Sequence, residues 1–105
     1  MVKVHIWVRR RDDMTPEAFR EYWTNTHAPI ARDGYQHLNS YAVDFVTRVP
    51  EGQEAPYDGV ATLTWDDRDG FRADMGSEAA ARATEDLHGF AAAFGLLFVE
   101  GLSVR

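Results

Sequence analysis

The chain has 105 residues, of which 45% are hydrophobic and 12% aromatic, and its net charge at pH 7 is −6. This acidic balance argues against nucleic-acid binding, which needs a basic surface to neutralise phosphates. The chain contains no cysteine, so disulfides, thiolate nucleophiles and Cys-ligated zinc or iron–sulfur centres are excluded.

Residues 3 to 9 form the first element that we expect. Val4, Ile6 and Val8 alternate with larger polar or aromatic residues. This two-residue period predicts a strand. Because Trp7 lies among the polar set, the second face of the strand is not simply exposed to water.

A helix is predicted to begin at Thr15-Pro16-Glu17. Thr15 can cap it, Pro16 suits the first helical position, and Glu17 complements the positive end of the helix dipole. We expect an inward face that consists of Phe19, Trp23, Thr26 and Ile30.

Two signals predict where this first helix ends. Pro29 disfavours a helical conformation at Ala28, so the helix should kink or end near His27. Asp33-Gly34 is a stop signal.

The remaining elements follow in order. Strands are predicted over 38–49, 59–65 and 96–104, and helical structure over about 68–94 with a break at Gly76-Ser77, where Ser77 can cap the second part. In the strand 38–49, alternation assigns Tyr41, Val43 and Phe45 to one face. The other face then carries Leu38, Ala42 and Val46.

The predicted order is β-α-β-β-α-β, without repeats or a second core, so we expect a single domain over residues 1–105. Right-handed crossovers place both helical segments on one face of a four-stranded antiparallel sheet, which is the α+β, ferredoxin-like arrangement. The opposite sheet face still carries apolar residues. An exposed patch of this kind usually marks an interface, so we expect a homodimer that is joined through the sheet faces.

His27 is the leading candidate for chemistry. It lies at the edge of the inward helix face, and the unperturbed pKa of imidazole suits a general acid or base near neutral pH. The alternative is that His27 only complements the negative end of the helix dipole. Trp23, on the same face, is either core or pocket wall.

Three further residues are candidates for substrate contacts. The Tyr22 hydroxyl could orient a substrate carbonyl, although packing is an alternative. Tyr41 and Asp44 point to opposite faces of their strand, and we choose Tyr41 as the pocket residue. A carboxylate at Asp86 near His27 would fix the imidazole tautomer and raise its pKa, but a capping or solvated aspartate is equally consistent with its position.

The other histidines are weaker candidates. His5 belongs to the pocket or to the dimer interface, His88 to the surface and His37 to a loop. No histidine pair has the spacing of a metal motif, and no glycine-rich phosphate loop is present. We therefore expect neither metal nor cofactor.

Several segments together resemble a known family. "MTPEAFREYWTNTHAPIAR" is similar to the first-helix signature of the EthD family, within the dimeric α+β barrel superfamily. "LNSYAVDF", "YDGVATLTWDD" and "ATEDLHGF" resemble later family segments in the same order. The resemblance implies a homodimer whose sheets close a barrel, with a pocket between sheet and helices in each subunit. It also implies cytoplasmic, cofactor-free work on small molecules. Leu87 departs from the pattern, since an acidic residue often follows the family Asp that corresponds to Asp86.

These observations lead to three functional hypotheses. The first is a cofactor-independent enzyme that uses His27 as acid/base on a small hydrophobic cyclic or polyketide-like substrate, by cyclisation, dehydration, decarboxylation or isomerisation, in secondary metabolism or aromatic catabolism. The second is a cofactor-free, quinone-forming monooxygenase, which would consume oxygen with a hydroxyanthrone-type substrate. The third is a dimer that binds a small molecule without chemistry.

The same sequence predicts a cytoplasmic protein with no membrane partner. The N-terminal segment MVKVHIWVRR lacks the apolar region of a signal peptide. No stretch approaches the roughly 20 apolar residues that span a bilayer. The absence of cysteine is consistent with a reducing compartment.

Overall fold

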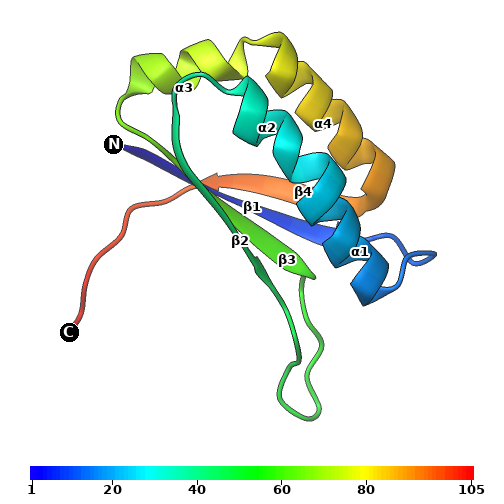
Figure 1. Ribbon diagram of the computed structural model, residues 1–105. Helices are drawn as coiled ribbons and strands as arrows, with labels where there is room; N and C mark the ends of the chain where they lie inside the picture. The colour runs from blue at the N-terminus through cyan, green and yellow to red at the C-terminus, as the bar shows by residue number, and fades with distance from the viewer.

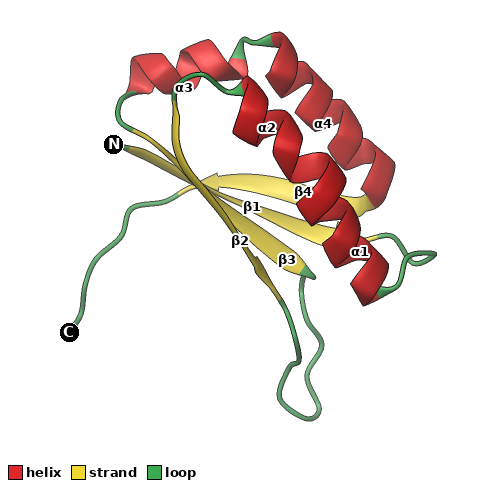
Figure 2. Ribbon diagram, viewed as in Figure 1, coloured by secondary structure: helices red, strands yellow, loops and turns green.

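The computed structural model describes all 105 residues as a four-stranded antiparallel sheet covered on one face by helices (Figures 1 and 2). The strands are β1 (Val2–Arg10), β2 (Leu38–Phe45), β3 (Gly59–Trp65) and β4 (Ala91–Phe98). Their order in the sheet is β2-β3-β1-β4, so the two central strands are β1 and β3. This is the ferredoxin-like topology that the element order predicts.

Five helical segments make up the covering layer. They are α1 (Pro16–Tyr22), the π-helical turn η1 (Trp23–His27), α2 (Ala28–Gly34), α3 (Arg68–Met75) and α4 (Glu78–Phe90). The predicted caps are confirmed: Thr15 Oγ1 accepts from the Ala18 N–H at 3.1 Å, and Ser77 Oγ accepts from the Ala80 N–H at 3.2 Å. No helix is long and apolar enough to cross a bilayer.

The first helix continues past His27, contrary to one part of the prediction. Pro29 has no N–H to donate to the helix. The helix is wider just before it, since the Ala28 N–H bonds to the Trp23 carbonyl five residues back, as in a π-helix. Regular α-helix then resumes and runs to Gly34.

The wide turn also changes which residues face the sheet. In a regular α-helix each step of four residues rotates by about 40°, so a long row at this spacing drifts off one face. The π turn offsets that drift. The buried row is Phe19, Trp23, His27 and Ala31. The predicted inward positions Thr26 and Ile30 are wrong, since Thr26 is exposed and Ile30 is only half-buried.

The largest differences from the predicted boundaries are at the end of β2 and around β4, predicted over 96–104. β2 ends at Phe45 instead of residue 49. The second helical region ends at Phe90 instead of Phe94, and β4 therefore begins at Ala91 and ends at Phe98. Phe94 and Leu96 are two residues apart in β4, and both side chains point toward the helices. In the sequence, this short apolar run resembles the end of an apolar helix. Residues 99–105 leave the sheet as an extended tail (Figure 1).

The face assigned to Leu38 is also wrong. The register of β2 against β3 shifts between Leu38 and Ser40. This irregularity inserts a residue and reverses the alternation on one side of it. Leu38 therefore packs against the same core as Tyr41, Val43 and Phe45.

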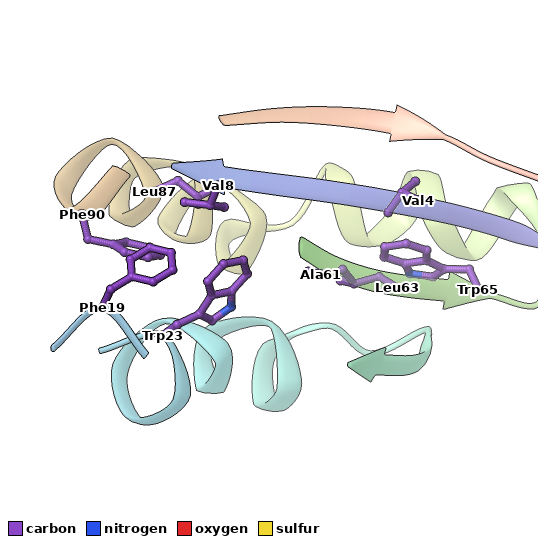
Figure 3. Packing of buried hydrophobic residues seen from close by; sticks show 9 residues of the cluster. All are labelled: Val4, Val8, Phe19, Trp23, Ala61, Leu63, Trp65, Leu87 and Phe90. Carbon is purple, nitrogen blue, oxygen red and sulfur yellow. The ribbon is translucent and has the colours of Figure 1, made fainter. Parts of the chain in front are cut away.

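The core lies between the sheet and the helices and has two ends. Figure 3 shows Trp23 beside Phe19 and Phe90 at one end, and Trp65 beside Leu63 at the other. At the first end the rings of Phe19 and Trp23 meet edge to face, with centroids 5.6 Å apart. Trp23 and Trp65 are each 1% exposed. Two large indoles thus bound the space between the ends.

The opposite face of the sheet carries no helix (Figure 2). Trp7 packs against Gly95 on the neighbouring strand, where a Cβ atom would lie 2.5 Å from the indole nitrogen. Leu97, on the same face of β4, is 54% exposed. This face therefore presents apolar side chains to its surroundings.

Candidate functional site

A cavity of about 120 Å³ lies between the sheet and the helices. All four strands contribute to its wall, and so do η1, α2, α3 and α4. Sixteen residues line it, and fourteen of them are hydrophobic. Thr84 on α4 and Leu96 on β4 line the cavity and are exposed, so its mouth opens between these two elements.

His27 forms part of the cavity wall. Its side chain is 8% exposed, and its Nδ1 lies 2.8 Å from Asp86 Oδ2. An ionised carboxylate can only accept, so the Nδ1–H donates to Asp86. In the neutral ring the lone pair is then on Nε2, which makes no hydrogen bond within the protein. The contact thus fixes the tautomer of His27 and leaves a basic nitrogen free.

Two opposing effects act on the pKa of His27. Burial disfavours the imidazolium and is the larger effect, whereas the hydrogen bond to Asp86 and its negative charge favour the imidazolium. The net result is a pKa below the ordinary value of 6.5. His27 is therefore neutral at pH 7, the state in which Nε2 can accept a proton.

Asp86 and Tyr22 lie behind His27. The Tyr22 hydroxyl donates to Asp86 Oδ1 at 2.6 Å, so the two carboxylate oxygens hold two different side chains. This hydrogen bond, together with burial and the charge of Asp86, raises the pKa of Tyr22 to about 12. Neither Tyr22 nor Asp86 lines the cavity. That they contact substrate stays a prediction; in the structure both oxygens of Asp86 already have partners, and the Tyr22 ring packs on Phe90.

A close helix contact brings His27 and Asp86 together. At Gly34, the last residue of α2, a Cβ atom would lie 2.6 Å from the Cβ of Ala79 on α4. Only glycine allows the two helices to approach this closely. Their packing aligns η1, which precedes α2, with the later turns of α4 where Asp86 lies.

Trp23 and Tyr41 line the cavity and are joined by a hydrogen bond. The indole N–H of Trp23 donates to the Tyr41 hydroxyl at 2.9 Å. Burial raises the pKa of Tyr41, although the bond from Trp23 opposes this shift. The Tyr41 oxygen thus serves as acceptor for Trp23, while its own O–H donates to no group of the protein. Asp44, on the opposite face of β2, is exposed.

Sequence reasoning missed Tyr35 and Asp74. Tyr35 follows the helix stop at Gly34 and lines the cavity, and burial raises its pKa to about 12, with smaller effects of Tyr41 and Asp74. Asp74 is 2% exposed and accepts hydrogen bonds from the Trp65 indole and the His37 N–H. It therefore holds the far wall of the cavity. Tyr35 could have been found from its position, since it is an aromatic residue directly after a helix stop. No sequence signal distinguished Asp74 from the other acidic residues.

The remaining histidines lie away from the cavity. His5 is on the open sheet face opposite Thr62 and Leu97, and His88 and His37 are exposed. His88 contacts the Phe94 ring with centroids 5.0 Å apart. No three His, Asp or Glu side chains come together as a group that could hold a metal ion.

Comparisons with known proteins agree with this architecture. The model of the EthD domain matches residues 11–93, whereas no curated protein matches the chain significantly. A crystal structure of an ethyl tert-butyl ether D (EthD) family protein from Bacillus halodurans superposes with a TM-score of 0.78 at 23% identity, covering 97% of this chain and 100% of that one.

Two more distant structures share the fold. A dimeric ferredoxin-like protein of unknown function from Thermobifida fusca is 19% identical, with a TM-score of 0.72 over 93% of this chain and 88% of that one. A structure described as an antibiotic biosynthesis monooxygenase is 14% identical, with a TM-score of 0.61 over 98% and 100% of the two chains.

Proposed function

Because the chain belongs to the EthD family and holds a buried histidine paired with a partly buried aspartate at a cavity, we propose that it is a cofactor-independent enzyme with His27 as its general base and acid. Its substrate is a small hydrophobic cyclic compound that carries a carbonyl or phenol group. One observation carries the proposal: His27 lines the cavity while its Nδ1 is held by Asp86 at 2.8 Å.

The chemistry follows from the state of each group. Neutral His27 accepts a proton at Nε2 from a carbon next to the substrate carbonyl, and the imidazolium is stabilised by Asp86. Tyr41 donates its O–H to the oxygen on which negative charge develops. His27 then returns the proton to a different atom. This sequence serves isomerisation, dehydration and cyclisation alike, since each begins with removal of a proton next to a carbonyl.

The test is exchange of α-hydrogens of cyclohexanone and of the larger ketone 2-tetralone in D₂O, followed by mass spectrometry. The wild-type protein should accelerate exchange of at least one of them. His27→Gln should lower the rate roughly 10²- to 10⁴-fold, the usual contribution of a positioned acid/base, because an amide cannot shuttle a proton. His88→Gln on the exposed side of α4 is the matched control and should retain the wild-type rate.

Two outcomes count against the proposal. Equal exchange by the wild-type protein and His27→Gln would remove His27 from the mechanism. Binding of the ketone without any exchange, with His27→Gln altering affinity alone, would instead support a non-catalytic binding protein.

A second candidate is a cofactor-free, quinone-forming monooxygenase, which the likeness to the antibiotic biosynthesis monooxygenase structure supports. His27 would then generate a phenolate that reacts with O₂. A fused three-ring substrate is hard to accommodate, because a cavity of about 150 Å³ holds one benzene molecule and this one is about 120 Å³. Oxygen uptake with a hydroxyanthrone separates this candidate from the first.

We also propose that two copies pair through their open sheet faces. Trp7 and the half-exposed Leu97 give this face an apolar surface, and the structurally similar protein from Thermobifida fusca is described as dimeric. Face-to-face pairing about a two-fold axis would bury both copies of this surface.

A further inference from the structure

We infer that the cavity selects a neutral, single-ring compound with one oxygen that accepts a hydrogen bond, such as a simple phenol or a cyclic ketone. The inference rests on the proposed function, since it concerns the same site, but it specifies the size, charge and polar pattern of the substrate. Three independent features of the cavity carry it.

Size sets the first limit. The cavity measures about 120 Å³, and an engineered apolar cavity of about 150 Å³ binds benzene. The two tryptophans lie at opposite ends of the core (Figure 3) and are both fully buried. Interior packing is dense, so a second fused ring would have to displace one of them. A ligand larger than one ring can fit only if its additional substituent projects out of the cavity through the mouth at Thr84 and Leu96.

Charge sets the second limit. None of the sixteen lining residues is Lys or Arg. His27 is neutral because burial lowers its pKa, and its Nδ1–H is already donated to Asp86. A carboxylate or phosphate would therefore enter an apolar space without a cation, which is costly. The cavity discriminates against anions of the same size.

The polar pattern sets the third limit. Tyr35 and Tyr41 line the cavity, and burial raises the pKa of both phenols further above neutral, so both are protonated at pH 7. The Tyr41 oxygen accepts from Trp23 and its O–H donates to no group of the protein, so this O–H is available to an occupant of the cavity. His27 Nε2 supplies the basic nitrogen. A ligand that satisfies these groups has an acceptor oxygen and a hydrogen that can be lost next to it.

Binding alone tests this inference. Phenol, cyclohexanone, benzoate and 1-naphthol are titrated at pH 7 while the indole N–H signals of Trp23 and Trp65 are followed by NMR. Phenol and cyclohexanone should shift both signals, and benzoate and 1-naphthol should bind at least tenfold more weakly. Tyr41→Phe should weaken phenol binding roughly 2- to 10-fold, the usual range for one hydrogen bond. Tyr57→Phe, whose residue lies outside the cavity lining, should leave it unchanged.

The inference is overturned if benzoate or 1-naphthol binds as tightly as phenol, if no probe binds, or if Tyr41→Phe has no effect. Its failure is distinct from failure of the proposed function. Binding of phenol and cyclohexanone without proton exchange leaves the cavity assignment intact and removes the chemistry. Exchange of 2-tetralone without binding of the single-ring probes would support the chemistry and overturn the assignment of the cavity to single-ring compounds.

Discussion

His27 and Asp86 are 59 positions apart in the chain, and their side chains meet at 2.8 Å. One belongs to a π-helical turn and the other to the last long helix. Because the carboxylate only accepts, the contact decides which imidazole nitrogen carries the proton. The basic nitrogen that remains belongs to a side chain that lines the cavity.

The low pKa of His27 predicts a pH dependence of stability. In the unfolded chain the ring takes up a proton near pH 6.5, whereas in the folded protein it does so only at lower pH because it is buried. Between these two values the unfolded state binds more protons. The contribution of His27 is therefore complete above pH 6.5 and is lost as the pH falls through its folded-state pKa.

Urea denaturation of the wild-type protein and His27→Gln between pH 4 and 8 measures this contribution. The difference in unfolding free energy between the two proteins should shrink as the pH falls. A difference that stays constant, or that grows toward acid, would mean that the folded protein does not hold the ring neutral.

Tyr22 and Asp86 should move the pKa of His27 in opposite directions. Asp86→Asn removes the charge that favours the imidazolium, so burial acts alone and the pKa falls further. Tyr22→Phe removes the donor that shares the carboxylate, so Asp86 interacts more strongly with His27 and the pKa rises. NMR titration of the His27 ring measures both. Shifts of the same sign in the two variants would contradict this arrangement.

Phe19 anchors the aromatic end of the core and should be costly to truncate. Its side chain is 2% exposed and contacts the rings of Trp23, Phe45 and Phe90. Phe19→Ala should lower the unfolding free energy by about 3–5 kcal/mol, as for other buried aromatic residues. Phe98→Ala is the control, because Phe98 is 67% exposed, and it should cost well under 2 kcal/mol. A loss below 1 kcal/mol for Phe19→Ala would show that the helix face is assigned wrongly.

The proposed dimer predicts the effect of a charge on the open sheet face. Leu97→Glu places a carboxylate between two apolar surfaces, which is unfavourable without a partner, so it should convert a dimer into a monomer at micromolar concentration in light scattering. Ala81→Glu, on the exposed side of α4, makes the same change in the helix layer and should remain dimeric. A wild-type protein that is already monomeric under these conditions would exclude the interface.

The sequence alone was sufficient for the architecture. Alternating β-branched residues, the caps at Thr15 and Ser77, and the break at Gly76-Ser77 are local signals, and local backbone preferences decide them. The β-α-β-β-α-β order then restricts the topology, since crossovers are right-handed. The errors lie where local signals compete, as at Pro29 and at the apolar run that begins β4.

The site depended on tertiary structure. His27 could be identified as a candidate because it lies at the edge of the inward helix face and imidazole titrates near neutral pH. Asp86 could be named as a candidate partner, but the sequence did not distinguish this role from that of a capping or solvated aspartate. The contact requires the π turn that keeps His27 on the buried row and the close approach of Gly34 to Ala79. The cavity likewise arises from all four strands and four of the five helical segments together. Sequence spacing specifies neighbours within an element, whereas distances between elements are decided by how their side chains pack.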